Sequence, residues 1–103
     1  MNLLHPLPAA GAEEHFQTLL SRPGVRMERI VSDGQASPPG FWYEQAEDEW
    51  VLLLQGNATL EYSDGIIYAL TSGDSLLIPA GLRHRVMHTG PRTVWLALFV
   101  PAS

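Results

Sequence analysis

The sequence predicts a small all-β protein in which antiparallel strands form one barrel or sandwich. The chain has 103 residues, which suits a single domain. From residue 25 onward, short apolar or alternating segments follow one another, and turns containing glycine, aspartate or proline separate them. No connection is long enough for the crossover that parallel strands need. Such regular punctuation is typical of an antiparallel sandwich or barrel.

The predicted strands differ in how many of their faces are apolar. Residues 49–55 (EWVLLLQ) and 93–100 (TVWLALFV) are apolar on both faces, as expected of strands that are packed on both sides. Residues 58–62 (ATLEY) alternate between apolar and polar side chains. Further strands are predicted at residues 25–31, 41–44, 66–70, 75–79 and 83–88.

We expect residues 1–24 to form an extended lead-in and one short helix, and residues 25–103 to form the barrel of the same single domain. In residues 12–21 (AEEHFQTLLS), a phenylalanine and two leucines have helical spacing. Two glutamates stand in the first turn, where the helix dipole favours acids. Pro23 and Gly24 are predicted to end this helix.

Composition excludes several classes of protein. The net charge is −5, and the six basic residues are all arginines, so we expect no nucleic-acid partner. The chain has no cysteine, which excludes disulfides and thiolate metal sites. No apolar run approaches the roughly 20 residues of a membrane span, and the amino terminus lacks the basic start of a signal peptide. We therefore expect a cytoplasmic protein without a membrane partner.

One segment, GDSLLIPAGLRH, carries a motif with fixed spacing. Gly73, Pro79, Gly81 and His84 stand at the positions of the second cupin motif, and His88 stands where that motif has asparagine. Glycine and proline at these places also agree with turn chemistry. The segment resembles the second motif of the cupin superfamily.

Two residues upstream match the end of the first cupin motif. Glu49 is followed after six residues by Gly56, and the short interval to the second motif is typical of small single-domain bacterial cupins. The resemblance covers about residues 25–100. It implies a cupin-type antiparallel β-barrel or jelly roll (a double-stranded β-helix), here with one short N-terminal helix.

The resemblance also implies a metal site. Cupins hold one divalent metal with two histidines and a glutamate from the first motif and a histidine from the second. Glu49 and His84 occupy two of these positions, but the paired histidines are missing. Depending on whether three or four residues separate the pair from the glutamate, its positions hold Tyr43 and Gln45, or Trp42 and Glu44.

The inherited ligand set is then Glu49 and His84, with Gln45, Glu44 or Tyr43 as a third member. Gln45 offers a carbonyl oxygen and Glu44 a carboxylate, and a one-residue slip in register decides which faces the cavity. Such a site suits Fe(II), Mn(II), Ni(II) or Zn(II). The alternative is a metal-free cupin in which Glu49 and His84 form a buried hydrogen-bonded pair.

Two functions follow as expectations. The first is a metal-dependent enzyme of the oxygenase, isomerase or lyase type, in which Tyr43 or His88 transfers a proton to or from a small organic substrate. His88 shares a face with His84 only if the strand is regular, and then lies about 13 Å away. The second function is a non-catalytic small-molecule-binding or sensory cupin without a metal. Because the last strand is apolar on both faces, we also expect a homodimer.

Overall fold

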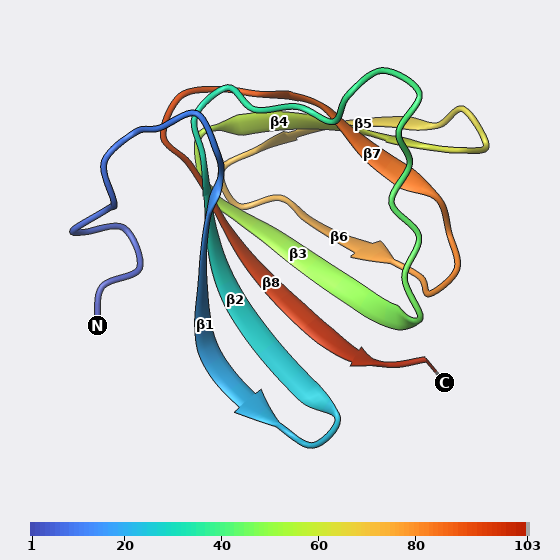
Figure 1. Cartoon of the computed structure of the whole chain (residues 1–103), viewed down its shortest axis with the longest axis horizontal. Coiled ribbons are helices and arrows are strands. Elements are labelled where there is room, and N and C mark those ends of the chain that lie inside the picture. The colour runs from blue at the N-terminus through green and yellow to red at the C-terminus, as the bar shows by residue number, and fades with distance from the viewer. Residues whose placement is uncertain (103) are drawn as a thin grey trace.

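The computed structural model describes residues 1–102 and contains two antiparallel sheets that face each other (Figure 1). The larger sheet has the strand order β1-β2-β8-β3-β6, and the smaller has the order β5-β4-β7. The strands are β1 (His15–Arg22), β2 (Val25–Ser32), β3 (Glu47–Gln55), β4 (Asn57–Tyr62), β5 (Ile67–Thr71), β6 (Ser75–Ile78), β7 (His84–Thr89) and β8 (Thr93–Pro101). The predicted all-β fold is confirmed.

The core lies between the two sheets and follows from strand alternation. In β3 and β8, Leu53 pairs with Trp95 and Val51 pairs with Ala97, and all four side chains are buried. Leu60 in β4 packs into the same cluster from the smaller sheet. The two strands predicted to be apolar on both faces are therefore neighbours at the centre of the larger sheet, where both faces need cover.

The predicted helix at residues 12–21 is wrong, because β1 occupies this segment and forms a hairpin with β2. Pro23 and Gly24 form the hairpin turn, in which Gly24 has a φ of 80° that suits the second central position of a type II turn. The register of β1 shifts at a bulge between Thr18 and Leu20. The bulge puts Phe16 and Leu20 on opposite faces of the sheet, although their spacing resembles one face of a helix.

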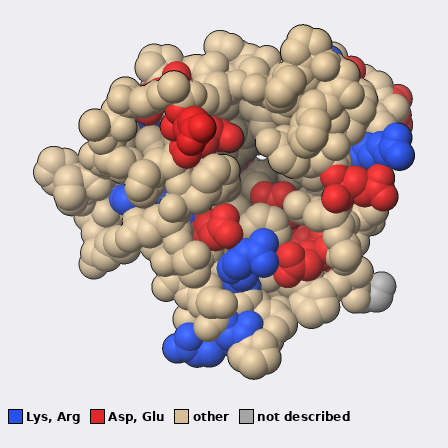
Figure 2. All heavy atoms as spheres, viewed as in Figure 1, with Lys and Arg blue, Asp and Glu red and all other residues tan. Residues whose placement is uncertain are grey.

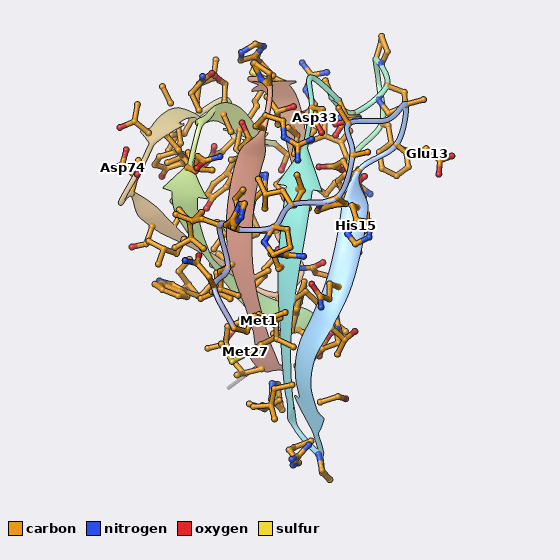
Figure 3. All side chains as sticks on the ribbon, turned by 90° about the vertical axis from the view of Figure 1, so that its left-hand side faces the viewer. Met1, Glu13, His15, Met27, Asp33 and Asp74 are labelled. Carbon is orange, nitrogen blue, oxygen red and sulfur yellow. The ribbon has the colours of Figure 1, made fainter. Side chains whose placement is uncertain are left out.

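The segment before β1 crosses the outer face of the larger sheet (Figure 3). Arg29 of β2 is buried beneath it and donates from Nη1 to the carbonyl oxygens of Leu3 and Pro6, each at 3.4 Å. Arg92 donates to the carbonyl oxygen of Pro8. The lead-in, which turns at an isolated bridge between Asn2 and His5, is therefore fixed to the sheet through its own backbone. No helix within residues 1–102 is long and apolar enough to cross a membrane.

Gly56, at the turn between β3 and β4, is held in a conformation that only glycine fits. Its φ is 91°, and a Cβ atom at this position would lie 2.8 Å from the Cα of Thr93 and closer still to Thr93 Oγ1. Thr93 cannot yield easily, because it is fully buried and its hydroxyl donates to the carbonyl oxygen of Gly90 at 2.8 Å. This steric constraint gives the first-motif glycine its physical reason.

We predict that Gly56→Ala destabilises the fold by about 3–5 kcal/mol, because backbone strain adds to a backbone clash. The matched control is Gly65→Ala. Gly65 has nearly the same φ, 92°, but no atom lies within 4 Å of its added Cβ, so about 1–2 kcal/mol is expected. Denaturant unfolding measures both. Equal losses in the two variants would show that Thr93 does not constrain Gly56.

Candidate functional site

A cavity of about 190 Å³ lies between the sheets. In the space-filling view a hollow opens near the centre of the molecule, with acidic side chains around it (Figure 2). The cavity is lined by Glu14, Phe16, Glu28, Ile30, Tyr43, Gln45, Glu49, Val51, Leu60, Ile78, His84, Val86, Trp95 and Phe99. Both sheets and two loops therefore contribute to one pocket.

The loop that carries the second motif fixes the segment before β3. Tyr43 and His84 exchange backbone hydrogen bonds, at 2.7 Å from Tyr43 N to His84 O and 3.0 Å in the other direction. Gly81 N donates to the carbonyl oxygen of Gln45 at 2.8 Å. Residues 41–44 were predicted as a strand, but only the bridge between Tyr43 and His84 forms there. These few bonds decide which side chains of the segment enter the cavity.

Glu49 and His84 come together deep in the cavity. The distance from Glu49 Oε1 to His84 Nε2 is 4.0 Å, and the residues are 9% and 5% exposed. Gln45 Nε2 donates to Glu49 Oε1 at 2.8 Å. His84 Nδ1 lies 3.0 Å from the carbonyl oxygen of Leu82, which can only accept, so Nδ1 carries the proton. In the neutral ring, Nε2 then presents a lone pair to the cavity.

Burial raises the pKa of the Glu49 carboxyl group above its ordinary value. The hydrogen bond from Gln45 and the nearby His84 act in the opposite direction but do not cancel the desolvation. Glu49 is thus a carboxyl group that takes up a proton more readily than an exposed glutamate. Beside the lone pair of His84, it forms an acid–base pair within one cavity.

Tyr43 stands over His84 at the edge of the pocket. The two rings stack with centroids 5.9 Å apart and planes inclined by 27°. Burial raises the pKa of the Tyr43 hydroxyl, and the charge of Glu14 raises it further. The hydroxyl therefore stays protonated at neutral pH and can donate a hydrogen bond to a ligand.

The structure separates the two alternative third ligands. Gln45 lines the cavity, whereas Glu44 is exposed and its Oε2 accepts from Arg83 Nε at 2.9 Å. Successive residues of an extended segment point to opposite sides, so Gln45 and Glu44 cannot both face inward. The ion pair with Arg83 holds Glu44 on the outer surface.

His88 lies outside the cavity. His84 and Val86 line the pocket, and regular alternation would add His88. The pairing of β7 with β4 instead shifts by one residue, so that Leu60 faces Val86 and Thr59 faces His88. His88 is exposed, and its Nε2 lies 3.2 Å from Asn57 Oδ1. Because the bulge turns His88 away from the cavity, its ring is not placed to exchange a proton with a molecule bound there.

Sequence reasoning missed the aromatic and acidic walls of the cavity. Glu14 and Phe16 enter it because β1 is a strand, and the predicted helix concealed this. Trp95 and Phe99 project from the inner face of β8. Strict alternation in the last strand was the signal for Trp95 and Phe99, but it did not show which face was inner.

The side chains in the cavity do not fit the resident metal that the family pattern implies. Within the described part of the chain, residues 1–102, no three His, Cys, Asp or Glu side chains converge as metal ligands. Glu49 and His84 supply two donors, and Gln45 adds only a neutral amide oxygen, since its Nε2 is bonded to Glu49 Oε1. Stable protein sites for such metals usually have at least three protein ligands.

We predict that Glu49→Gln stabilises the protein at pH 7–8 by on the order of 1 kcal/mol, because it removes a buried charge. The wild-type carboxyl has a raised pKa in the folded state, so ionisation costs stability as pH rises through that pKa. The advantage of the variant should shrink as pH falls toward the ordinary glutamate range. Thermal unfolding between pH 4 and 8 measures this trend. The control is Glu44→Gln, which changes an exposed carboxylate, and its stability relative to wild type should depend little on pH. The prediction would be contradicted if the wild type gained stability relative to Glu49→Gln as pH rises.

Comparisons with known proteins agree with this architecture. A family model described as "Cupin domain" matches residues 28–100. A solved structure from Ralstonia eutropha JMP134, named a "putative mannose-6-phosphate isomerase", is 45% identical with a TM-score of 0.95, over 99% of this chain and 97% of that chain. No curated protein matches the chain.

More distant structures share the fold alone. A cupin superfamily protein from Desulfitobacterium hafniense DCB-2 is 22% identical with a TM-score of 0.79, over 92% of this chain and 84% of that one. KdgF from Halomonas sp. is 19% identical with a TM-score of 0.78, over 100% and 94% of the two chains. With the family model matching residues 28–100, the chain belongs to the cupin family.

Proposed function

We propose that this cupin binds a small organic molecule between its sheets and that Glu49 and His84 contact the polar group of that molecule without a resident metal. One observation carries the proposal. His84 Nε2 lines the cavity in a residue that is 5% exposed and makes no hydrogen bond within residues 1–102, although Nδ1 is held by the carbonyl oxygen of Leu82. A ligand donor that reaches this ring nitrogen would gain a hydrogen bond inside a largely enclosed cavity.

The surroundings of this atom suit a small ligand. Most of the cavity wall is apolar or aromatic, and its few polar groups converge at Glu49 and His84, as in binding pockets generally. The carboxyl group of Glu49 and the ring of His84 are also groups that can transfer protons to or from a bound molecule. Isomerase or lyase chemistry that moves a proton is the reaction class that this pair supports.

A metal-dependent enzyme is the second candidate. The observation in its favour is the orientation of His84, because a ligating histidine usually donates its other ring N–H to a carbonyl oxygen, as Nδ1 does here. Its ligands would be His84, Glu49 and the carbonyl oxygen of Gln45. The donor set is weaker than three histidines and a glutamate, which is why we place this candidate second.

We predict that metal-free protein, purified without a histidine tag, binds small organic molecules in the cavity. In a titration with fragment mixtures followed by NMR, the indole N–H signal of Trp95 should shift, because its ring lines the pocket. His84→Ala should weaken the binding of polar fragments by about tenfold. The signal of His88, outside the cavity, is the internal control and should not move.

Metal analysis separates the two candidates. Mass spectrometry after reconstitution with Fe, Mn, Ni and Zn should find well under one metal ion per chain, and no difference between wild type and His84→Ala. One ion per wild-type chain that is lost in His84→Ala would support the metal-dependent enzyme. Fragment binding that requires this ion would overturn the metal-free proposal.

We also propose that two copies of the chain associate through the outer face of the larger sheet. Trp50 in β3 and Leu98 in β8 are paired neighbours on this face, and both are only partly buried. Leu77 in β6, paired with Trp50, is 55% exposed. The segment before β1 contacts Arg29 at the β2 side. The apolar residues nearer β6 are the surface that we assign to the second copy.

We predict a dimer in size-exclusion chromatography with light scattering, and we expect Leu77→Glu to produce monomers by placing a charge in the contact. Leu77 is exposed within the single chain, so the substitution should leave the monomer folded. The control is Ile67→Glu, which changes an equally exposed side chain on the smaller sheet. A wild type that stays monomeric at high protein concentration would contradict the proposal.

A further inference from the structure

The charged side chains of the cavity have one sign. Glu14, Glu28 and Glu49 line it, and within residues 1–102 no arginine is among the lining residues. Arg26 pairs with one of these carboxylates, since its guanidinium is bound to Glu28 at 3.0 Å and to Glu47 at 3.3 Å, and the ring of His84 lies 4.0 Å from Glu49. Arg26 therefore offsets part of the acidic charge and is not free to bind an anionic ligand.

The polar atoms of the cavity are mainly hydrogen-bond acceptors. Glu14 accepts from the hydroxyl of Ser32, and Glu49 accepts from Gln45, which leaves further acceptor capacity on each carboxylate. His84 Nε2, in a ring that is 5% exposed, adds an acceptor without a partner. The hydroxyl of Tyr43 and the second N–H of the Gln45 amide are the donors that remain. A ligand that pairs with these acceptors must carry several N–H donors.

Aromatic rings form the rest of the wall. Phe16, Tyr43, Trp95 and Phe99 all line the pocket. The face of an aromatic ring attracts a cation. Phe99 demonstrates this in the structure, because the guanidinium of Arg26 lies 4.1 Å from the centroid of its ring. Carboxylates and aromatic rings around one small cavity are the combination that recognises an organic ammonium group.

We infer that the ligand of this cavity is an organic amine in its ammonium form. The inference rests on the proposed function, since it names the class of molecule that the same cavity binds. The ammonium N–H groups would donate to Glu49 and His84 Nε2, and the positive charge would lie among Glu14, Glu28 and the aromatic rings. A phosphorylated or carboxylated ligand meets three carboxylates and no unpaired arginine, so the cavity disfavours it.

Three probes of nearly the same shape test the inference at pH 7: benzylammonium, benzyl alcohol and benzoate. They carry a positive charge, no charge and a negative charge. In titrations followed by the Trp95 indole N–H signal, we expect benzylammonium to bind about tenfold more tightly than benzyl alcohol. Benzoate should bind more weakly than the alcohol.

Matched variants show which carboxylates produce the preference for a cationic ligand. Glu14→Gln and Glu28→Gln should each weaken benzylammonium about three- to tenfold and leave benzyl alcohol unchanged. Glu13→Gln removes the same charge from the neighbouring residue, which is exposed and does not line the cavity, and should change neither affinity. The amide NMR spectrum of each variant verifies its fold.

The outcomes separate the inference from the function on which it rests. If benzyl alcohol or benzoate binds as tightly as benzylammonium, the cavity is a binding site but the inferred cation preference is wrong. An equal loss in Glu13→Gln and Glu14→Gln would also overturn the inference, because the preference would then reflect overall charge. If none of the three probes shifts the Trp95 signal, the inference and the proposed binding function fail together.

Discussion

The site depends on a short set of backbone hydrogen bonds between the second-motif loop and the segment before β3. Tyr43 and His84 bond through their main chains, and Gly81 binds the carbonyl oxygen of Gln45. Ala80 N also donates to the side chain of Asp48 at 2.8 Å. Because these bonds set the register of the segment, they put Gln45 inside and Glu44 outside. The loop glycine and proline therefore position the chemistry without contacting a ligand.

The same constraint makes a buried carboxylate tolerable. Glu49 lies on the inner face of β3, two residues before Val51, where an apolar side chain would be the ordinary choice. Its partners are the amide of Gln45 and the ring of His84, and both depend on the loop for their positions. These partners compensate the carboxylate only in part, which is why desolvation still raises its pKa.

The sequence predicted the structure correctly at positions where the fold accepts one residue type for a clear physical reason. The motif from Gly73 to His84, with Glu49 and Gly56 upstream, predicted the barrel and the Glu49–His84 pair. The structure adds the reason for Gly56, whose left-handed turn lies against Thr93. The errors came from bulges. One extra residue in β1 imitated helical spacing, and another in β7 turned His88 outward. A bulge depends on cross-strand pairing, so a local pattern along one strand cannot reveal it.

Replacement of two imidazoles changes the charge that the cavity requires. In the cupin pattern, a metal ion compensates the glutamate from the first motif. Here Tyr43 and Gln45 occupy the positions of the histidines and bring no positive charge, while Glu14 and Glu28 add negative charge from the β1–β2 side. Without a metal ion, such a pocket would keep unfilled acceptors and a negative charge that Arg26 offsets only in part. The ammonium ligand that we infer would restore both a positive charge and the missing donors, which would account for the departures from the family pattern and for the acidic walls together.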